Sequence, residues 1–314
     1  MRPDRRSRLP YRIRYRVGEY LLRALVAGLG CLPASARPYM AGITERVSYL
    51  LLWRYRKRMH DTLERTMGEE LPTDAARRTV VRGAWRNFTH AFVETFATLY
   101  MTRDELCSRI EIKGEERLRE ALARKKGVIA LSAHFGNFAI IGPRLVAQGY
   151  DFSAVVKLPQ DRRFAALQNE YCARAEVNII PARPRRQSVV QTIRALRRNE
   201  IVLLIPDEFK TAGVEVLFLG RRVPAPKGPI TIAQRTGAAV LPVFMVRDAH
   251  NRLTLHVEPE IEFLQTDDRE ADLRANAHLF VQEIEKMVRR HPDQWSWMGF
   301  RKPRKGDTSH ANTP

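Results

Sequence analysis

The sequence predicts an α/β protein with a mixed, mostly parallel sheet flanked by helices and an N-terminal helical, membrane-associated extension. From about residue 110, short and continuously apolar segments alternate with stretches of helical periodicity, as expected of strands buried on both faces. Residues 18–105 show helical spacing only. The first 60 residues contain 14 of the 54 basic residues and only three acids. A basic segment interleaved with apolar side chains favours an anionic membrane surface.

The extension, residues 1–109, is expected to form several helices. Thr73 precedes Asp74 at the start of one of them, where a threonine caps the free N–H groups. Apolar side chains then recur every three or four residues, which predicts that they pack against the rest of the protein. This stripe consists of Val80, Val81, Trp85, Phe88, Phe92 and Phe96. His90 beside the stripe is expected to have a structural role.

The net charge of +19 indicates a polyanionic partner, which is a nucleic acid, an anionic bilayer or a phosphorylated substrate. No apolar run approaches the roughly 20 residues that span a bilayer, so interfacial attachment to the cytoplasmic face of an inner membrane is predicted. A signal peptide is the competing interpretation of residues 1–32, but Arg23 interrupts the apolar run. The three cysteines are widely separated, which argues against disulfides and zinc. No metal or cofactor is predicted.

The α/β domain is expected to span residues 110–301, and residues 302–314 are expected to form an unfolded tail. Buried strands are predicted at 128–132, 153–156, 177–181 and 201–205, with helices at 138–148, 162–175 and 189–198 between them. Segments 214–219, 239–246 and 253–263 are expected to extend the same sheet, and a helix at 268–290 to close the domain.

His134 follows the first of these strands. Ligands of such sheets bind beyond the carboxyl ends of the strands, so a neutral imidazole there is placed to act as a general base. Gly136 would let the backbone approach a ligand, and N–H groups at the start of the next helix would stabilise an oxyanion.

The segment from His134 to Phe138, His-Phe-Gly-Asn-Phe, resembles the H-F-G-N-[WF] motif of the late acyltransferases of lipid A biosynthesis. This family belongs to the lysophospholipid acyltransferase superfamily. Further matches follow in the family's order over residues 16–301. They are the strand ending in Asp207, the F-x-G-R block at 218–221, the P-K-G-P block at 226–229, the R-T-G-A-A segment at 235–239 and H-P-D-Q-W-S-W at 291–297.

The resemblance implies an acyltransferase with His134 as its base. The implied donor is a thioester of acyl-carrier protein or coenzyme A, and the implied acceptor is a membrane glycolipid of the lipid A precursor type or a lysophospholipid. It also marks residues expected to bind substrate. These are Gly136, Asn137, Phe218, Gly220, Arg221, Lys227 and Gly228.

One residue departs from the family motif, in which an Asp or Glu stands at the fifth position after the histidine. Ala139 occupies that position here. Asp207 and Glu208 end another strand at the same edge of the predicted sheet, so one of them is expected to lie within hydrogen-bond distance of His134. Asp207 is slightly favoured because it matches the family better.

Basic side chains in the loops at that edge are expected to bind phosphate groups of the donor or acceptor. Arg221 is the leading candidate, and Arg183 another. Two alternatives to the enzyme remain open at this point. One is a catalytically silent relative that binds lipid as an accessory protein, because Ala139 replaces the acid. The other is a nucleic-acid-binding protein, which is suggested only by the charge.

Overall fold

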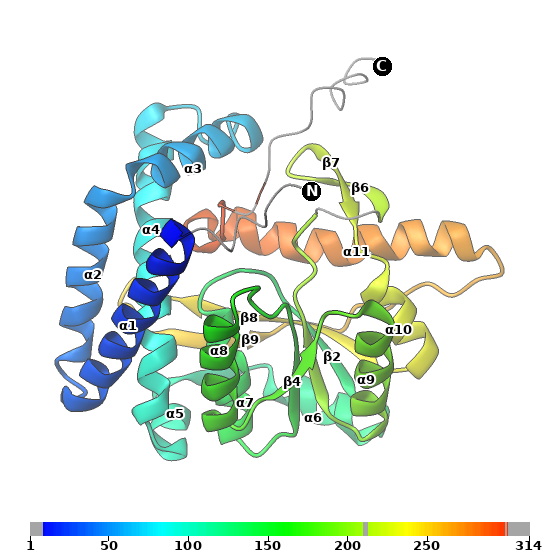
Figure 1. Ribbon diagram of the computed structural model, residues 1–314. Coiled ribbons are helices and arrows are strands. Elements are labelled where there is room, and N and C mark those ends of the chain that lie inside the picture. Colours follow the sequence, from blue (N-terminus) through cyan, green and yellow to red (C-terminus); the bar gives the residue numbers. More distant parts are fainter. Residues whose placement is uncertain (1–8, 210–212, 299, 301–314) are drawn as a thin grey trace.

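The computed structural model describes residues 9–209, 213–298 and 300. A central sheet carries helices on both faces (Figure 1). Its seven strands lie in the order β1-β9-β8-β2-β5-β3-β4, and every neighbouring pair is parallel except β8 and β9. The predicted fold class, a mixed and mostly parallel α/β sheet, is therefore confirmed. The strands are β1 (Glu111–Lys113), β2 (Val128–Leu131), β3 (Phe152–Val156), β4 (Asn178–Pro181), β5 (Ile201–Leu204), β8 (Ala239–Arg247) and β9 (Leu253–Val257).

The N-terminal helices gather at one side of the sheet (Figure 1). They are α1 (Leu9–Cys31), α2 (Arg37–Leu51), α3 (Trp53–Thr66), α4 (Asp74–Ala97) and α5 (Arg103–Arg109), with a 3-10 turn η2 (Thr98–Tyr100) before α5. Helix α4 begins where the sequence predicted, because the Thr73 hydroxyl accepts a hydrogen bond from the Ala76 N–H. None of the helices in the described part of the chain is both long and apolar enough to cross a membrane.

Two hydrophobic clusters fill the two faces of the sheet, because successive strand residues point to opposite sides. Ile129 and Leu131 of β2 belong to the cluster that includes side chains of α9 (Arg185–Arg197), α10 (Gly228–Thr236) and α11 (Arg269–Arg290). Val128 and Ala130 belong to the other cluster, with α6 (Glu115–Ala123), α7 (Ile141–Ala147) and α8 (Arg162–Arg174). Both faces are covered, which explains why the predicted strands are apolar throughout.

Segment 214–219 was expected to extend the main sheet, and this prediction was wrong. Strands β6 (Val214–Phe218) and β7 (Arg221–Ala225) pair with each other as an antiparallel hairpin outside the main sheet. Leu219 and Gly220 form its two-residue turn with φ of 49° and 70°. Positive φ at both positions is the geometry of a type I′ hairpin turn. Burial alternates along β6, whereas β2, β5 and β8 of the main sheet are buried throughout.

Other boundaries also differ from the sequence predictions, and the helix expected at 189–198 begins at Arg185. The last strand ends at Val257 rather than at residue 263. The helix expected at 138–148 is a 3-10 turn, η3 (Phe138–Ile140), followed by α7. Residues 134–137 form a loop, so the helix does not begin at the His134 motif. A last 3-10 turn, η4 (Pro292–Gln294), follows α11.

Candidate active site

His134 and Asp207 meet because two neighbouring strands end in register. Strands β2 and β5 are parallel, with Leu131 paired to Leu204. His134 stands three residues beyond Leu131, and Asp207 three residues beyond Leu204. Equal distances along two adjacent parallel strands bring the side chains to the same edge. The imidazole Nδ1 of His134 lies 2.6 Å from Oδ1 of Asp207, a distance inside the range expected from the sequence.

The carboxylate of Asp207 is held by three donors. Its Oδ2 accepts hydrogen bonds from the backbone N–H of His134 at 2.8 Å and from the indole N–H of Trp295 at 3.0 Å. Its Oδ1 is then directed at Nδ1 of His134, which fixes the proton on Nδ1 and leaves the lone pair on Nε2. The Asp207 side chain is 2% exposed and the His134 side chain 36% exposed. A buried acid thus orients an imidazole that reaches the surface.

The loop after His134 is clamped by the segment that follows α11. The Gly136 N–H donates to the Gln294 carbonyl at 2.8 Å, and the Ser296 N–H donates to the His134 carbonyl at 2.9 Å. Gly136 has a φ of +54°, and a side chain there would collide with the Met245 carbonyl of β8. The close approach of β8 therefore requires a glycine at this position.

Three consecutive backbone N–H groups of this loop donate hydrogen bonds to acceptors within the protein. Those of His134, Phe135 and Gly136 donate to Asp207, Ala133 and Gln294 respectively. The N–H groups of residues 134–136 therefore have partners inside the protein and precede the helical turn that begins at Phe138.

Asn137, which was expected to bind substrate, contacts α4 instead. Its amide group donates to the Ala91 carbonyl and to Glu94, and its Oδ1 accepts from the Thr95 hydroxyl. The side chain is buried. We therefore assign Asn137 to positioning the His134 loop on α4.

A buried ion pair extends this support. Both guanidinium nitrogens of Arg247 contact both carboxylate oxygens of Glu94, at 2.7 and 2.6 Å. The Arg247 Nε also donates to Asn87, and the backbone N–H and carbonyl of Arg247 bond to the Gln294 side chain. Sequence analysis missed Asn87, Glu94, Arg247 and Gln294, although Gln294 lies inside a quoted motif. A buried pair between distant segments has no local sequence pattern.

The second candidate acid lies elsewhere. Glu208 is paired with Lys157, with 3.6 Å between carboxylate and ammonium. Ala139, where the motif normally carries its acid, lies in η3. Asp207 is therefore the carboxylate that occupies the position beside the imidazole.

Comparison with known protein families shows to which family the chain belongs. The model of the bacterial lipid A biosynthesis acyltransferase family matches residues 7–301. The chain belongs to this family. It is an O-acyltransferase.

Named relatives of the acyltransferase come from two groups of bacteria. It is 24% identical over 226 residues to the lipid A biosynthesis palmitoleoyltransferase of Escherichia coli strain K12, with 71% of each chain covered. It is 25% identical over 243 residues to the phosphatidylinositol mannoside acyltransferase of Mycobacterium tuberculosis strain CDC 1551, covering 76% of this chain and 74% of the relative.

The F-x-G-R block of the acyltransferase is the turn of the β6–β7 hairpin. Phe218 is fully buried and stacks edge-to-face with Trp295 and Phe300. Gly220 supplies the positive φ of the turn, so both residues have a structural part here. Arg221 places its guanidinium over the Phe300 ring, 5.2 Å from the ring centre. Burial, and then the nearby charge of Arg65, lower the pKa of Arg221.

The remaining basic candidates of the acyltransferase lie farther along the sheet edge. Arg183 follows β4, which is three strands from β2, a spacing of roughly 14 Å. Lys227 precedes Gly228, the first residue of α10, and α10 leads into β8 beside β2. Arg183 is thus remote from the imidazole in the sheet, whereas Lys227 belongs to a neighbouring connection.

Proposed function

We propose that the acyltransferase moves a fatty acyl group from a thioester donor to a hydroxyl of a membrane glycolipid, with His134 as general base. The observation that carries this proposal is the 2.6 Å contact between His134 Nδ1 and Asp207 Oδ1. The two relatives support the acceptor class, since one is a palmitoleoyltransferase of lipid A biosynthesis and the other a phosphatidylinositol mannoside acyltransferase.

The proposed reaction is a direct transfer. Nε2 of His134 takes the proton from the acceptor hydroxyl, and the oxygen attacks the thioester carbonyl. The tetrahedral intermediate collapses with cleavage of the carbon–sulfur bond. The imidazolium then returns the proton to the departing thiolate, so that a thiol and an ester are the products. Asp207 stabilises the imidazolium while the proton is on the ring.

We further propose that the donor is acyl-carrier protein or coenzyme A, and that Lys227, Gly228 and Arg183 contact the donor's phosphate groups. Both donors end in a phosphopantetheine arm, and backbone N–H groups at a helix start bind phosphate. Gly228 begins the nine-residue helix α10, which supports this assignment. Arg183 would contact a more distant phosphate of an extended donor.

Residues 1–109 are proposed to hold the enzyme on the cytoplasmic face of an inner membrane. An outward stripe of apolar side chains on α2 supports this proposal. Tyr39, Ile43, Val47 and Leu50 recur at three- or four-residue spacing and are exposed. Leu51, Leu52 and Trp53 continue the exposed apolar surface around the corner into α3.

The alternative of a catalytically silent relative depended on Ala139. Asp207 has its carboxylate beside His134, so the lack of an acid at Ala139 no longer favours this alternative. Nucleic-acid binding rests on charge alone and receives no further support.

The proposal is tested with purified His134→Ala protein in a thioester-dependent assay. We expect acyl transfer to be lost while folding and vesicle binding are retained. Wild-type activity in this variant would exclude His134 as the base. Mass spectrometry of membrane lipids from cells with and without the gene would identify the acceptor and the acyl chain together.

A further inference from the structure

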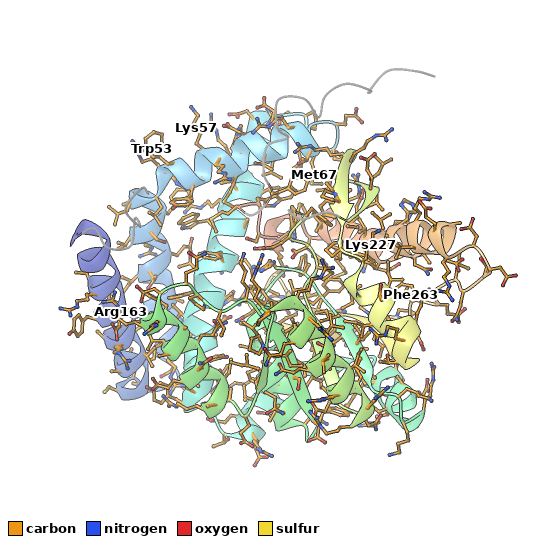
Figure 2. The ribbon with its side chains drawn as sticks, turned by 45° about the vertical axis from the view of Figure 1, so that its right-hand side comes forward. Trp53, Lys57, Met67, Arg163, Lys227 and Phe263 are labelled. Atoms are coloured by element: carbon orange, nitrogen blue, oxygen red, sulfur yellow. The ribbon has the colours of Figure 1, made fainter. Side chains whose placement is uncertain are left out.

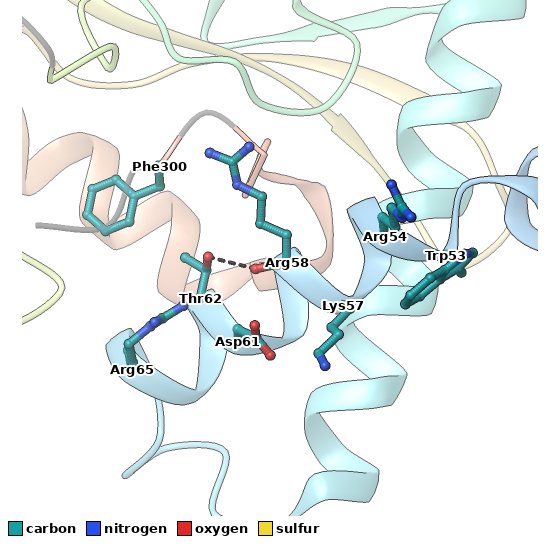
Figure 3. Close-up of a pocket in the computed structure, with 8 residues that line it drawn as sticks. All are labelled: Trp53, Arg54, Lys57, Arg58, Asp61, Thr62, Arg65 and Phe300. Atoms are coloured by element: carbon teal, nitrogen blue, oxygen red, sulfur yellow. Dashed lines mark hydrogen bonds between the residues drawn. The ribbon is translucent and has the colours of Figure 1, made fainter.

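A cation-lined pocket lies along α3. Its volume is about 520 Å³, which is within the usual range of small-molecule sites. Arg54, Lys57, Arg58 and Arg65 line it, and Asp61 is the one acid among the described residues of its wall. Arg54, Arg58, Asp61 and Arg65 follow one another at three- or four-residue spacing along α3, and Lys57 is next to Arg58, so they share one face of the helix. Figure 3 shows the Arg58 side chain reaching from α3 toward the segment that carries Phe300.

The cations of this pocket have few protein partners. Among the described residues 9–209, 213–298 and 300, no carboxylate lies within ion-pair distance of the four α3 cations. Arg221 adds a fifth positive charge next to the pocket, because it covers Phe300 and lies near Arg65. Five positive charges gathered around one carboxylate, that of Asp61, repel one another in the free protein. An anionic ligand would relieve this repulsion.

The position of the pocket indicates where its anion comes from. Trp53 forms one end of the pocket and also ends the exposed apolar corner of Leu50, Leu51 and Leu52. Figure 2 shows Trp53 and Lys57 on the outer side of α3. Tryptophan is favoured at the level of lipid headgroups, and phosphate groups lie at that level. Arg65 is 12 residues from Trp53, roughly 18 Å along the helix.

The other end of the pocket leads toward the catalytic pair. Phe300 stacks on Trp295, with 5.5 Å between ring centres. The Trp295 indole in turn donates to Asp207. One aromatic side chain therefore separates the pocket wall from the acid that orients His134. A headgroup held in the pocket would be near the enzyme's reaction centre as well as at the membrane surface.

We propose that this pocket binds the phosphate group of a membrane-lipid headgroup. The proposal rests on the membrane attachment proposed above. Arg58 and Arg65 are its principal ligands, because guanidinium groups bind phosphate through paired charge-assisted hydrogen bonds. The phosphate belongs either to the acceptor lipid itself or to an anionic phospholipid of the bilayer. An acidic partner protein is less suited, because it would leave the adjoining corner of Leu50–Leu52 exposed.

The first test measures binding of dioctanoyl phosphatidic acid, a phosphate monoester lipid, to the full chain by calorimetry. Arg58→Gln/Arg65→Gln should weaken this binding roughly tenfold or more, since two charged hydrogen-bond donors are lost. Arg194→Gln/Arg197→Gln is the matched control, because it removes two exposed charges from α9. The control should bind as the wild type does. Thermal melting of both variants establishes that they are folded.

Two further arms identify the source of the phosphate. If it is a bulk lipid, the pocket variant should lose affinity for phosphatidylcholine vesicles that contain phosphatidylglycerol. If it is the acceptor, vesicle affinity should persist, while KM for the acceptor rises and kcat does not change. Either result supports a lipid-phosphate pocket.

The proposal is overturned if both double variants lose affinity for phosphatidic acid equally, or if neither does. It is also overturned if the pocket variant loses only binding to acyl-carrier protein, since the α3 surface would then be a protein-docking site. These binding measurements are repeated in His134→Ala protein. Retained catalysis in that protein would refute the proposed base without changing the result for the pocket.

Discussion

The carboxyl edge of the sheet and the N-terminal helices use the same kinds of side chain in opposite ways. At the edge, the Arg247 side chain is 7% exposed and paired with Glu94, and Trp295 is buried against Asp207. On α2 and α3, Leu50 is 74% exposed and Trp53 55%, and Arg58 and Arg65 line an open pocket. Internal partners make the first region a rigid support, whereas the second presents its groups to an external partner.

The largest expected effect concerns the acid at the rigid edge. In Asp207→Asn, an amide N–H facing His134 would move the ring proton to Nε2 and remove the base. Turnover should fall about 10³- to 10⁴-fold, as measured in the thioester assay. Ala139→Glu should partly restore activity in Asp207→Asn and change little alone. A large gain from Ala139→Glu in the native protein would contradict the role of Asp207.

The next-largest effect is expected in the stability of the Glu94–Arg247 network, which supports the edge of the sheet. Arg247→Met leaves the partly buried Glu94 carboxylate without its guanidinium partner, which should cost about 2–3 kcal/mol of unfolding free energy. Urea denaturation measures the change. Arg252→Ala, which breaks the exposed pair with Asp248, is the control and should change stability far less. Similar losses in the two variants would mean that the buried network is not a specific support.

In the N-terminal helices, substitutions should weaken membrane binding and leave stability nearly unchanged. Ile43→Ser/Val47→Ser removes two exposed apolar side chains from α2, so stability should hardly change. Vesicle affinity should fall by about 2 kcal/mol, or roughly 30-fold, if both side chains enter the bilayer. Val190→Ser/Leu264→Ser alters two exposed apolar residues elsewhere and should retain affinity. If the two double variants bind vesicles equally well in flotation assays, the α2 stripe does not contact the membrane.

The smallest effect is expected where the two regions join. His90 of α4 contacts Glu45 of α2 at 3.2 Å. Burial lowers the pKa of His90, as does the charge of Arg247, against opposing contributions from Glu94 and Glu45. Below pH of about 6.5 the unfolded chain binds a proton that the folded chain resists, so stability should fall as the pH decreases. The loss between pH 7.5 and 5.5 should be smaller in His90→Phe.

Much of the α/β region could be predicted because its signals are local. Continuous apolar segments marked β2, β3, β4, β5 and β8, and the ends of two of them brought His134 and Asp207 to one edge. The β6–β7 hairpin was mispredicted because the apolar content of β6 was given more weight than its alternation and the Leu219–Gly220 turn.

Side-chain partners between distant segments were less predictable. The spacing of Phe88 and Phe92 predicted packing, yet both side chains are exposed, because helical periodicity identifies a face without identifying what covers it. The Glu94–Arg247 pair was missed because the two residues are 153 positions apart. The roles of Gly136 and Asn137 depended equally on β8 and α4, which their own motif does not specify.

The register between β2 and β5 has a consequence for the divergence of related enzymes. His134 and Asp207 are 73 residues apart, but their separation in space depends only on the three residues that follow each strand. Insertions or deletions in the intervening connections, such as residues 157–161 before α8, leave that relationship unchanged. Such connections can therefore change in length without moving Asp207 away from His134.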